Sequence, residues 1–79
     1  MQEEYAKIAA IIAEQLRIDL SAVREDSLIV EELGADSVDI VEILTALEDR
    51  YQLTVEDEEI ASLKTPGDIL AYIAEQHGS

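Results

Sequence analysis

Apolar residues recur at helical spacing along this chain, and no stretch alternates apolar and polar residues as a half-buried strand does. The spacing predicts a first helix from Gln2 to Leu16 and a second from Ser37 to Arg50. In each helix the apolar positions follow i, i+3, i+4 and i+7, so they share one face. The first stripe is Tyr5, Ile8, Ala9, Ile12 and Leu16, widened by Ile11, and the second is Ile40, Ile43, Leu44, Leu47 and Tyr51.

Two shorter helices are predicted in the last third of the chain. One covers about Asp57 to Ser62. The other begins at Thr65-Pro66-Gly67-Asp68, where threonine is a good cap, proline suits the first helical position and the aspartate completes a capping-box-like pattern. We expect Ile69, Leu70 and Ile73 to face the core and Gln76 to Ser79 to fray.

A long connection, about Arg17 to Ala35, separates the first two helices. A loop of this length is usually anchored, so we expect its apolar residues to fold back onto the core. They are Ile18, Leu20, Val23, Leu28 and Leu33. With 79 residues and no repeat or linker, residues 1–79 are predicted to form a single all-α domain. The expected architecture is a small four-helix bundle with a long loop between helices one and two and a short third helix.

The formal net charge is −14, from 19 acids and 5 bases, so the chain is expected to bind no nucleic acid and to suit basic partners. The N-terminal residues lack the basic and apolar parts of a secretory signal, and no apolar run could span a bilayer. The absence of Cys excludes disulfides and thiolate zinc sites. We therefore expect a soluble protein of the cytoplasm or of an organelle matrix, with the cytoplasm preferred, and no membrane insertion. The protein is also expected to be a monomer.

The acids are concentrated in one part of the chain. Eleven lie between Glu31 and Glu59, where Arg50 is the only base. Neither Asp57-Glu58-Glu59 nor the group around Asp36 has the spacing of a calcium loop of the EF-hand type. We expect no specific metal site, only weak binding of divalent ions.

The segment Gly34-Ala35-Asp36-Ser37-Val38-Asp39 places a serine at the start of the second helix. Gly34 permits a tight turn, Asp36 is a suitable N-cap, and an acid such as Asp39 is favoured in the first turn. A catalytic serine would need a nearby base, yet the one histidine, His77, lies in the tail. Because Asp36 takes the cap role, the Ser37 hydroxyl is left to point outward, where the helix N-terminus would stabilise a phosphate. The pattern favours an attachment point, with a helix-start serine without further function as the alternative.

The outward face of the second helix mixes apolar and acidic residues. Val38, Val41 and Thr45 lie among acids that include Glu42 and Glu48. Exposed apolar residues ringed by carboxylates are typical of a docking surface for a basic partner, although single exposed apolar residues are also normal.

The segment from Glu32 to Asp39, continuing through Val41-Glu42-Ile43-Leu44 and Ala46-Leu47-Glu48, closely resembles the acyl carrier proteins. The length, the acidity, the long first loop, Asp57-Glu58-Glu59 and the late Tyr72-Ile73 fit the same family. The resemblance covers essentially the whole chain. Its Gly-x-Asp-Ser core is short, and it becomes specific in combination with the acidic helix and the all-α frame.

The resemblance implies that Ser37 carries 4′-phosphopantetheine, which a magnesium-dependent phosphopantetheinyl transferase (holo-acyl carrier protein synthase) adds from coenzyme A. The thiol of this group would hold acyl chains as thioesters, so the cofactor supplies the sulfur that the chain lacks. Asp36 is expected to engage the transferase and its metal. The protein would be a carrier and not an enzyme. Its expected docking face, for basic patches on acyltransferase, ketosynthase and reductase type enzymes, is Asp36, Val38, Asp39, Val41, Glu42, Thr45 and Glu48.

Several positions depart from the commonest pattern of the family. Val38 stands where leucine is usual. Ile40 stands where a small polar residue is frequent, and Thr45 where methionine is frequent. Three further positions also differ from the commonest residue, namely Arg50, Tyr51 and Glu56. Ile40 is expected to narrow any cavity for an acyl chain, and the shorter Val38 and Thr45 surface to weaken generic docking. A specialised polyketide or lipid-modifying pathway is one hypothesis and fatty acid synthesis the other. A small acidic helical interaction domain without a prosthetic group is the alternative outside the family.

Overall fold

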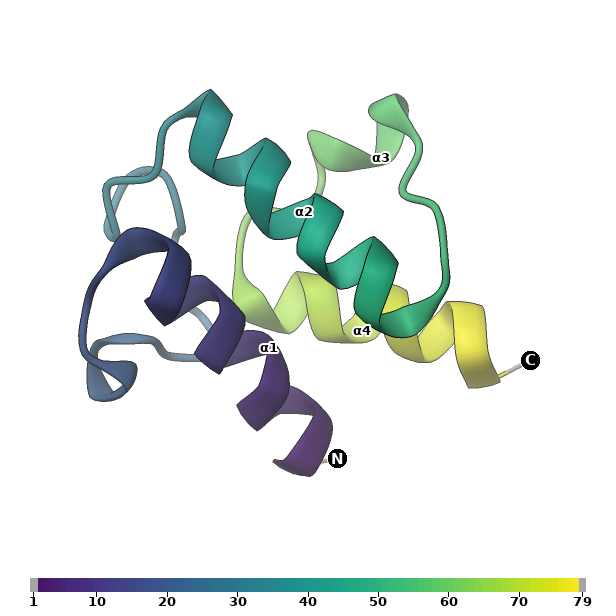
Figure 1. Cartoon of the computed structure of the whole chain (residues 1–79), viewed down its shortest axis with the longest axis horizontal. Coiled ribbons are helices and arrows are strands. Elements are labelled where there is room, and N and C mark those ends of the chain that lie inside the picture. The colour runs from purple at the N-terminus through teal and green to yellow at the C-terminus, as the bar shows by residue number, and fades with distance from the viewer. Residues whose placement is uncertain (1, 79) are drawn as a thin grey trace.

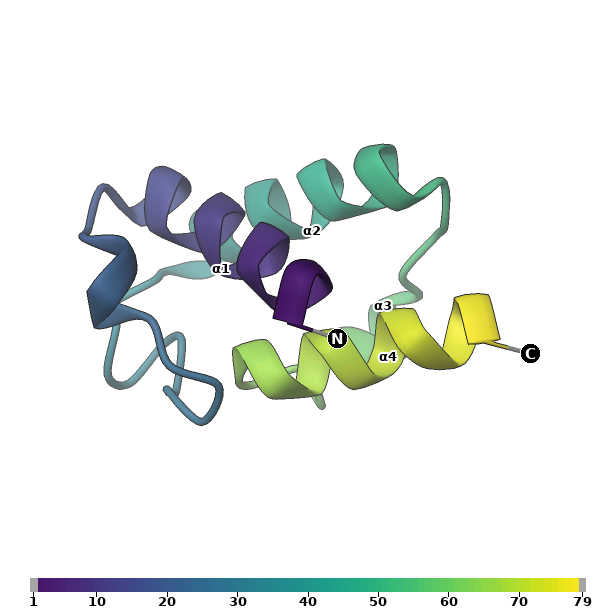
Figure 2. The same cartoon turned by 90° about the horizontal axis from the view of Figure 1, so that it is seen from below.

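The fold is known from a computed structural model that describes residues 2–78. The elements in chain order are α1 (Gln2–Leu16), a 3-10 helix η1 (Leu20–Ala22), α2 (Ser37–Tyr51), α3 (Asp57–Ile60) and α4 (Pro66–Gly78). Every element in this range is helical, which confirms the predicted all-α class. Helix α1 packs against both α2 and α4, and α3 lies on the side of α2 away from α1 (Figure 1). Figure 2 shows α4 running below α1 and α2.

The predicted apolar stripes form the core. Ile8 and Ile12 of α1 are fully buried, Ile43 and Leu47 of α2 are 1% exposed, and α4 adds three buried residues, Ile69, Leu70 and Ile73. At the edges of the stripes, Tyr5, Leu16, Ile40 and Tyr51 pack against this core but are only partly buried. The helical period therefore identified the inward faces, and the ends of each stripe lie near solvent.

The long loop contributes to the core, as expected, but not with all of its predicted residues. Val23 is buried, Ile18 and Leu33 pack partly buried against the core and Leu28 is half-buried. The prediction is wrong for Leu20, which is 54% exposed at the start of η1. Ile29, which the sequence did not single out, is 1% exposed.

Ile29 connects distant parts of the chain through its backbone. Its N–H donates to the carbonyl of Lys64 at 3.0 Å, and its carbonyl accepts from the N–H of Ala35 at 3.1 Å. The first bond joins the end of the long loop to the segment between α3 and α4, and the second closes the last turn of the loop before α2. They fix the position from which α2 begins.

The helix boundaries differ from the expected ones by one or two residues. Helix α2 continues to Tyr51 and ends at Gln52, whose φ of 55° is left-handed, while α3 stops at Ile60 instead of Ser62. The predicted cap of α4 is present: Asp68 N–H donates to Thr65 Oγ1 at 3.0 Å, and Thr65 N–H donates to Asp68 Oδ2 at 3.2 Å. Helix α4 continues to Gly78, beyond the expected fraying at Gln76; the His77 side chain and Ser79 lie outside the described part. No helix within residues 2–78 is long and apolar enough to cross a bilayer.

Gly67 lies where the long loop crosses the start of α4. Its N–H donates to the Glu25 carbonyl at 2.8 Å, and a Cβ at this position would be 3.0 Å from that carbonyl oxygen and 3.0 Å from Glu25 Cγ. Gly67→Ala should therefore lower the free energy of unfolding by about 1–3 kcal/mol, because the Glu25 backbone cannot move freely away from the added methyl group. Urea unfolding measures the change. At an open helical site the same substitution stabilises by roughly 0.5–1 kcal/mol, so a gain in stability would contradict this contact.

Candidate functional site

Ser37 is the first residue of α2 and is exposed. The preceding turn depends on Gly34, whose φ of 81° lies in the left-handed region that favours glycine, and on Ala35, which is buried. Asp36 is the N-cap: its Oδ1 accepts from Asp39 N–H at 2.9 Å, and Asp39 Oδ2 accepts from Asp36 N–H at 3.3 Å. The reciprocal capping box confirms the predicted cap and fixes the helix start at Ser37.

The hydroxyl of Ser37 makes no hydrogen bond to another side chain or to the backbone within residues 2–78. The cap is made by the neighbouring aspartate, so the serine is not needed for it. A reacting serine would have a base within hydrogen-bond reach, and none contacts Ser37 in this part of the chain. An exposed hydroxyl at the positive end of a helix is, however, well placed to be esterified with a phosphate.

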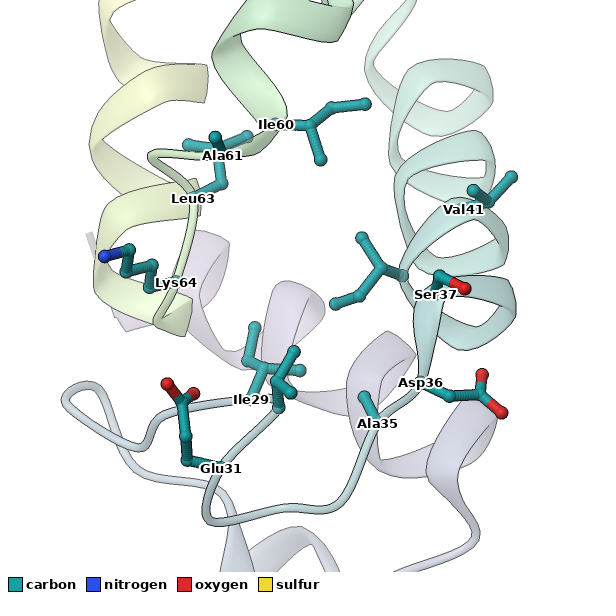
Figure 3. A pocket seen from close by; sticks show the side chains of 12 residues that line it. Ile29, Glu31, Ala35, Asp36, Ser37, Val41, Ile60, Ala61, Leu63 and Lys64 are labelled. Atoms are coloured by element: carbon teal, nitrogen blue, oxygen red, sulfur yellow. The ribbon is translucent and has the colours of Figure 1, made fainter.

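A cavity of about 510 Å³ opens next to Ser37, between α2, α3 and the end of the long loop. This volume is within the range of small-molecule sites. Figure 3 shows Ser37 at the α2 edge of the cavity, with Ile60, Ala61 and Leu63 across from it. The walls are mostly apolar, and few of the lining residues are charged. The lining residues are Ile29, Val30, Glu31, Ala35, Asp36, Ser37, Ile40, Val41, Ile60, Ala61, Leu63 and Lys64.

The residues of the predicted docking face occupy different environments. Val38 and Val41 are 61% and 57% exposed, which confirms that they point outward. Thr45 is exposed, but its hydroxyl donates to the Val41 carbonyl at 2.8 Å. Glu42 Oε1 accepts from Gln15 Nε2 of α1 at 2.5 Å.

Glu48 differs from the other acids of this face. It is half-buried, and its Oε2 accepts from the backbone N–H of Val55 at 2.7 Å. From the sequence, this carboxylate is predicted to bind partners, and its bond to the α2–α3 connection is an additional role that was not predicted. No sequence motif predicts a hydrogen bond between a helix side chain and a backbone amide seven residues later.

The residues that complete the site were not predicted from the sequence. Val30 is 52% exposed and lines the same cavity as Ser37, and Ile60 and Lys64 lie across the cavity from Ser37 (Figure 3). They come from a loop and a short helix whose apolar residues have no regular period, so only the folded chain brings them to Ser37. In the part of the chain that the structure describes, no group of three or more His, Cys, Asp or Glu side chains is arranged to hold a metal ion.

Comparison with known proteins identifies the family of this site. Residues 6–73 match the sequence model of the phosphopantetheine attachment site. The chain is 38% identical over 71 residues to an acyl carrier protein of Helicobacter hepaticus, covering 90% of this chain and 93% of that protein. It is 42% identical over 66 residues to one of Wolinella succinogenes (84% and 87%) and 35% identical over 77 residues to one of Thermotoga maritima (98% and 95%).

The fold agrees with these relatives. The solved structure of a candidate acyl carrier protein from Mycobacterium tuberculosis superposes with a TM-score of 0.85 at 27% identity, covering 92% of this chain and 97% of that one. Proteins of this family are not enzymes; they carry acyl groups on phosphopantetheine and interact with phosphopantetheinyl transferases and synthase enzymes. Together, the matched attachment-site model, the relatives along nearly the whole chain and the shared fold show that this chain belongs to the acyl carrier protein family.

Proposed function

We propose that Ser37 is the residue to which 4′-phosphopantetheine is attached, through a phosphodiester on its Oγ. The single observation that carries this proposal is the exposed hydroxyl without a protein partner, at the capped start of α2 and beside an apolar cavity. The bound group supplies a thiol that forms thioesters. The chain supplies a fixed attachment point, a helix N-terminus that stabilises the phosphate and an apolar surface for the carried chain.

The cavity beside Ser37 supports an acyl chain as the cargo. Ile29, Ile40, Ile60 and Leu63 give it apolar walls, which would remove part of a carried hydrocarbon from water. We propose that the protein delivers such acyl groups to synthesis enzymes in the cytoplasm. The similarity to acyl carrier proteins supports fatty acid synthesis as the pathway, because it is the usual role of that family.

A specialised pathway is the narrower proposal, and it depends on Ile40 together with the shorter docking surface at Val38 and Thr45. Ile40 lies in the cavity wall, where it reduces the space for a long chain. An octanoyl group on the protein would then be less protected from hydrolysis than on an Ile40→Ala variant. Full protection of octanoyl or longer chains, with normal turnover by fatty acid synthase enzymes, would contradict this proposal.

Loading of the protein tests the proposed attachment. The protein is incubated with coenzyme A, Mg²⁺ and a promiscuous phosphopantetheinyl transferase, and its intact mass is measured. We expect the mass to increase by one phosphopantetheine group, located by peptide mapping to the segment that contains Ser37. A folded protein without this increase would instead support the alternative of an acidic interaction domain.

Glu42→Lys should slow the reaction with partner enzymes. An exposed charge at the rim of a docking surface acts mainly on the encounter rate, so we expect kcat/KM for a partner to fall about fivefold to tenfold at low salt. The measurement is partner kinetics at two salt concentrations, because screening should reduce the difference. Circular dichroism checks that helicity is retained after the Gln15 contact is lost.

The matched control is Glu14→Lys, which makes the same charge change at an exposed position of α1. It should leave kcat/KM nearly unchanged. Equal slowing by both variants would show that only the net charge matters and that Glu42 is part of a solvated surface.

A further inference from the structure

Helix α3 forms one wall of the cavity, and its last residue, Ile60, packs partly buried against the core. It contains four residues, Asp57–Ile60, and none of them is buried. Ile60 and Ala61 nevertheless line the cavity opposite Ser37 (Figure 3). A helix this short is not stable by itself, so contacts outside it must hold the wall in place.

The segment after α3 is attached to the core. Leu63 is buried, and the carbonyl of Lys64 accepts from the N–H of Ile29 at 3.0 Å. This contact holds the C-terminal side of the wall on the long loop. The position of α3 then depends on what holds its N-terminal side.

Two side-chain hydrogen bonds hold the connection that leads into α3, in addition to the packing of Leu53 and Val55 against the core. Glu48 Oε2 accepts from Val55 N–H at 2.7 Å, and the Tyr72 hydroxyl donates to the Thr54 carbonyl at 3.2 Å. A tyrosine hydroxyl is protonated at neutral pH and can donate, and burial, followed by the nearby Glu59 carboxylate, raises the pKa of Tyr72 further. Of the two contacts, the one from Glu48 is shorter and has a carboxylate acceptor, which makes it the stronger bond.

We propose that Glu48 is a positioning residue for the acyl cavity: by binding the Val55 amide it holds α3 over the cavity and thereby protects the carried chain. The protection of a carried chain rests on the proposed attachment at Ser37. The position of α3 does not depend on that attachment. Glu48 therefore has a role that the other acids of the docking face do not share. Its substitution would change the cavity wall as well as the charge of the surface.

The first test measures hydrogen exchange of backbone amides in the protein without a prosthetic group. In Glu48→Ala, we expect the amide of Val55 and those of α3 to exchange about tenfold faster, while the amides of α1 and α4 keep their rates. Glu48→Gln keeps a side-chain oxygen for this bond but loses the charge, so these amides should exchange only about threefold faster than in the parent. Asp49→Ala is the matched control, because it removes one neighbouring exposed carboxylate and should leave these rates unchanged.

The second test measures hydrolysis of an octanoyl thioester on the loaded protein. Glu48→Ala should lose the acyl group at least about twice as fast as the parent, and Glu48→Gln and Asp49→Ala should not. Unchanged exchange, faster exchange throughout α1 and α4, or equal effects of Ala and Gln would each overturn the positioning role. Faster exchange with unchanged hydrolysis would overturn the protection of the chain. Failure to load Ser37 would refute the proposed function separately, since the exchange test needs no cofactor.

Discussion

Ser37→Ala is expected to abolish addition of phosphopantetheine while leaving the fold intact. The phosphodiester needs the serine oxygen, and alanine offers no nucleophile in its place. The folded structure should not change, because the Ser37 hydroxyl has no hydrogen bond within residues 2–78 and the helix cap is made by Asp36. The expected change in the free energy of unfolding is within about 0.5 kcal/mol. Intact mass after incubation with coenzyme A, Mg²⁺ and the transferase gives the result, and urea unfolding gives the stability.

Ser62→Ala is the matched control. Ser62 is also exposed, but its hydroxyl donates to the Glu59 carbonyl at 2.8 Å, and the residue is not at a helix start. This variant should load as the parent does. If Ser37→Ala still gained one phosphopantetheine, or if Ser62→Ala lost it, Ser37 would not be the attachment residue.

The parts of this structure that follow from local rules could be predicted from the sequence. Helical period located the stripes of α1 and α2, because a buried helix face repeats its apolar residues every three or four positions. The two caps were also predictable, since Asp36 and Thr65 bond to groups only three residues away. The exposed serine followed from the same cap, because the aspartate before it satisfies the helix start.

The parts that depend on distant residues could not be predicted. Ile29 is buried because its backbone bonds to Lys64, 35 positions later, and no periodic pattern marks it. The cavity is formed by three separate segments, so its walls exist only after the chain has folded. Glu48 shows the same limit: the composition of α2 suggested a surface acid, whereas the structure bonds it to Val55.

Asp36→Asn is expected to reduce loading by the transferase strongly while keeping the stability of the protein. Asparagine is as good an N-cap as aspartate, because its side-chain oxygen can still accept from the N–H of Asp39, where Asp36 Oδ1 now accepts at 2.9 Å. The negative charge is lost, however, and from the family resemblance we expect this carboxylate to engage the transferase and its metal. We expect kcat/KM for loading to fall by at least about tenfold, which is the loss typical of removing one partner of a close charge pair.

Asp36→Ala separates the two roles of this residue. It removes the cap as well as the charge, so it should lose about 0.5–2 kcal/mol of stability in urea unfolding, whereas Asp36→Asn should lose almost none. Loading should be slow in both variants and slow to a similar extent. If the asparagine variant loaded at the parent rate and only the alanine variant were slow, Asp36 would act solely by fixing the start of α2, and the transferase would recognise the shape of the turn at Ser37 without its charge.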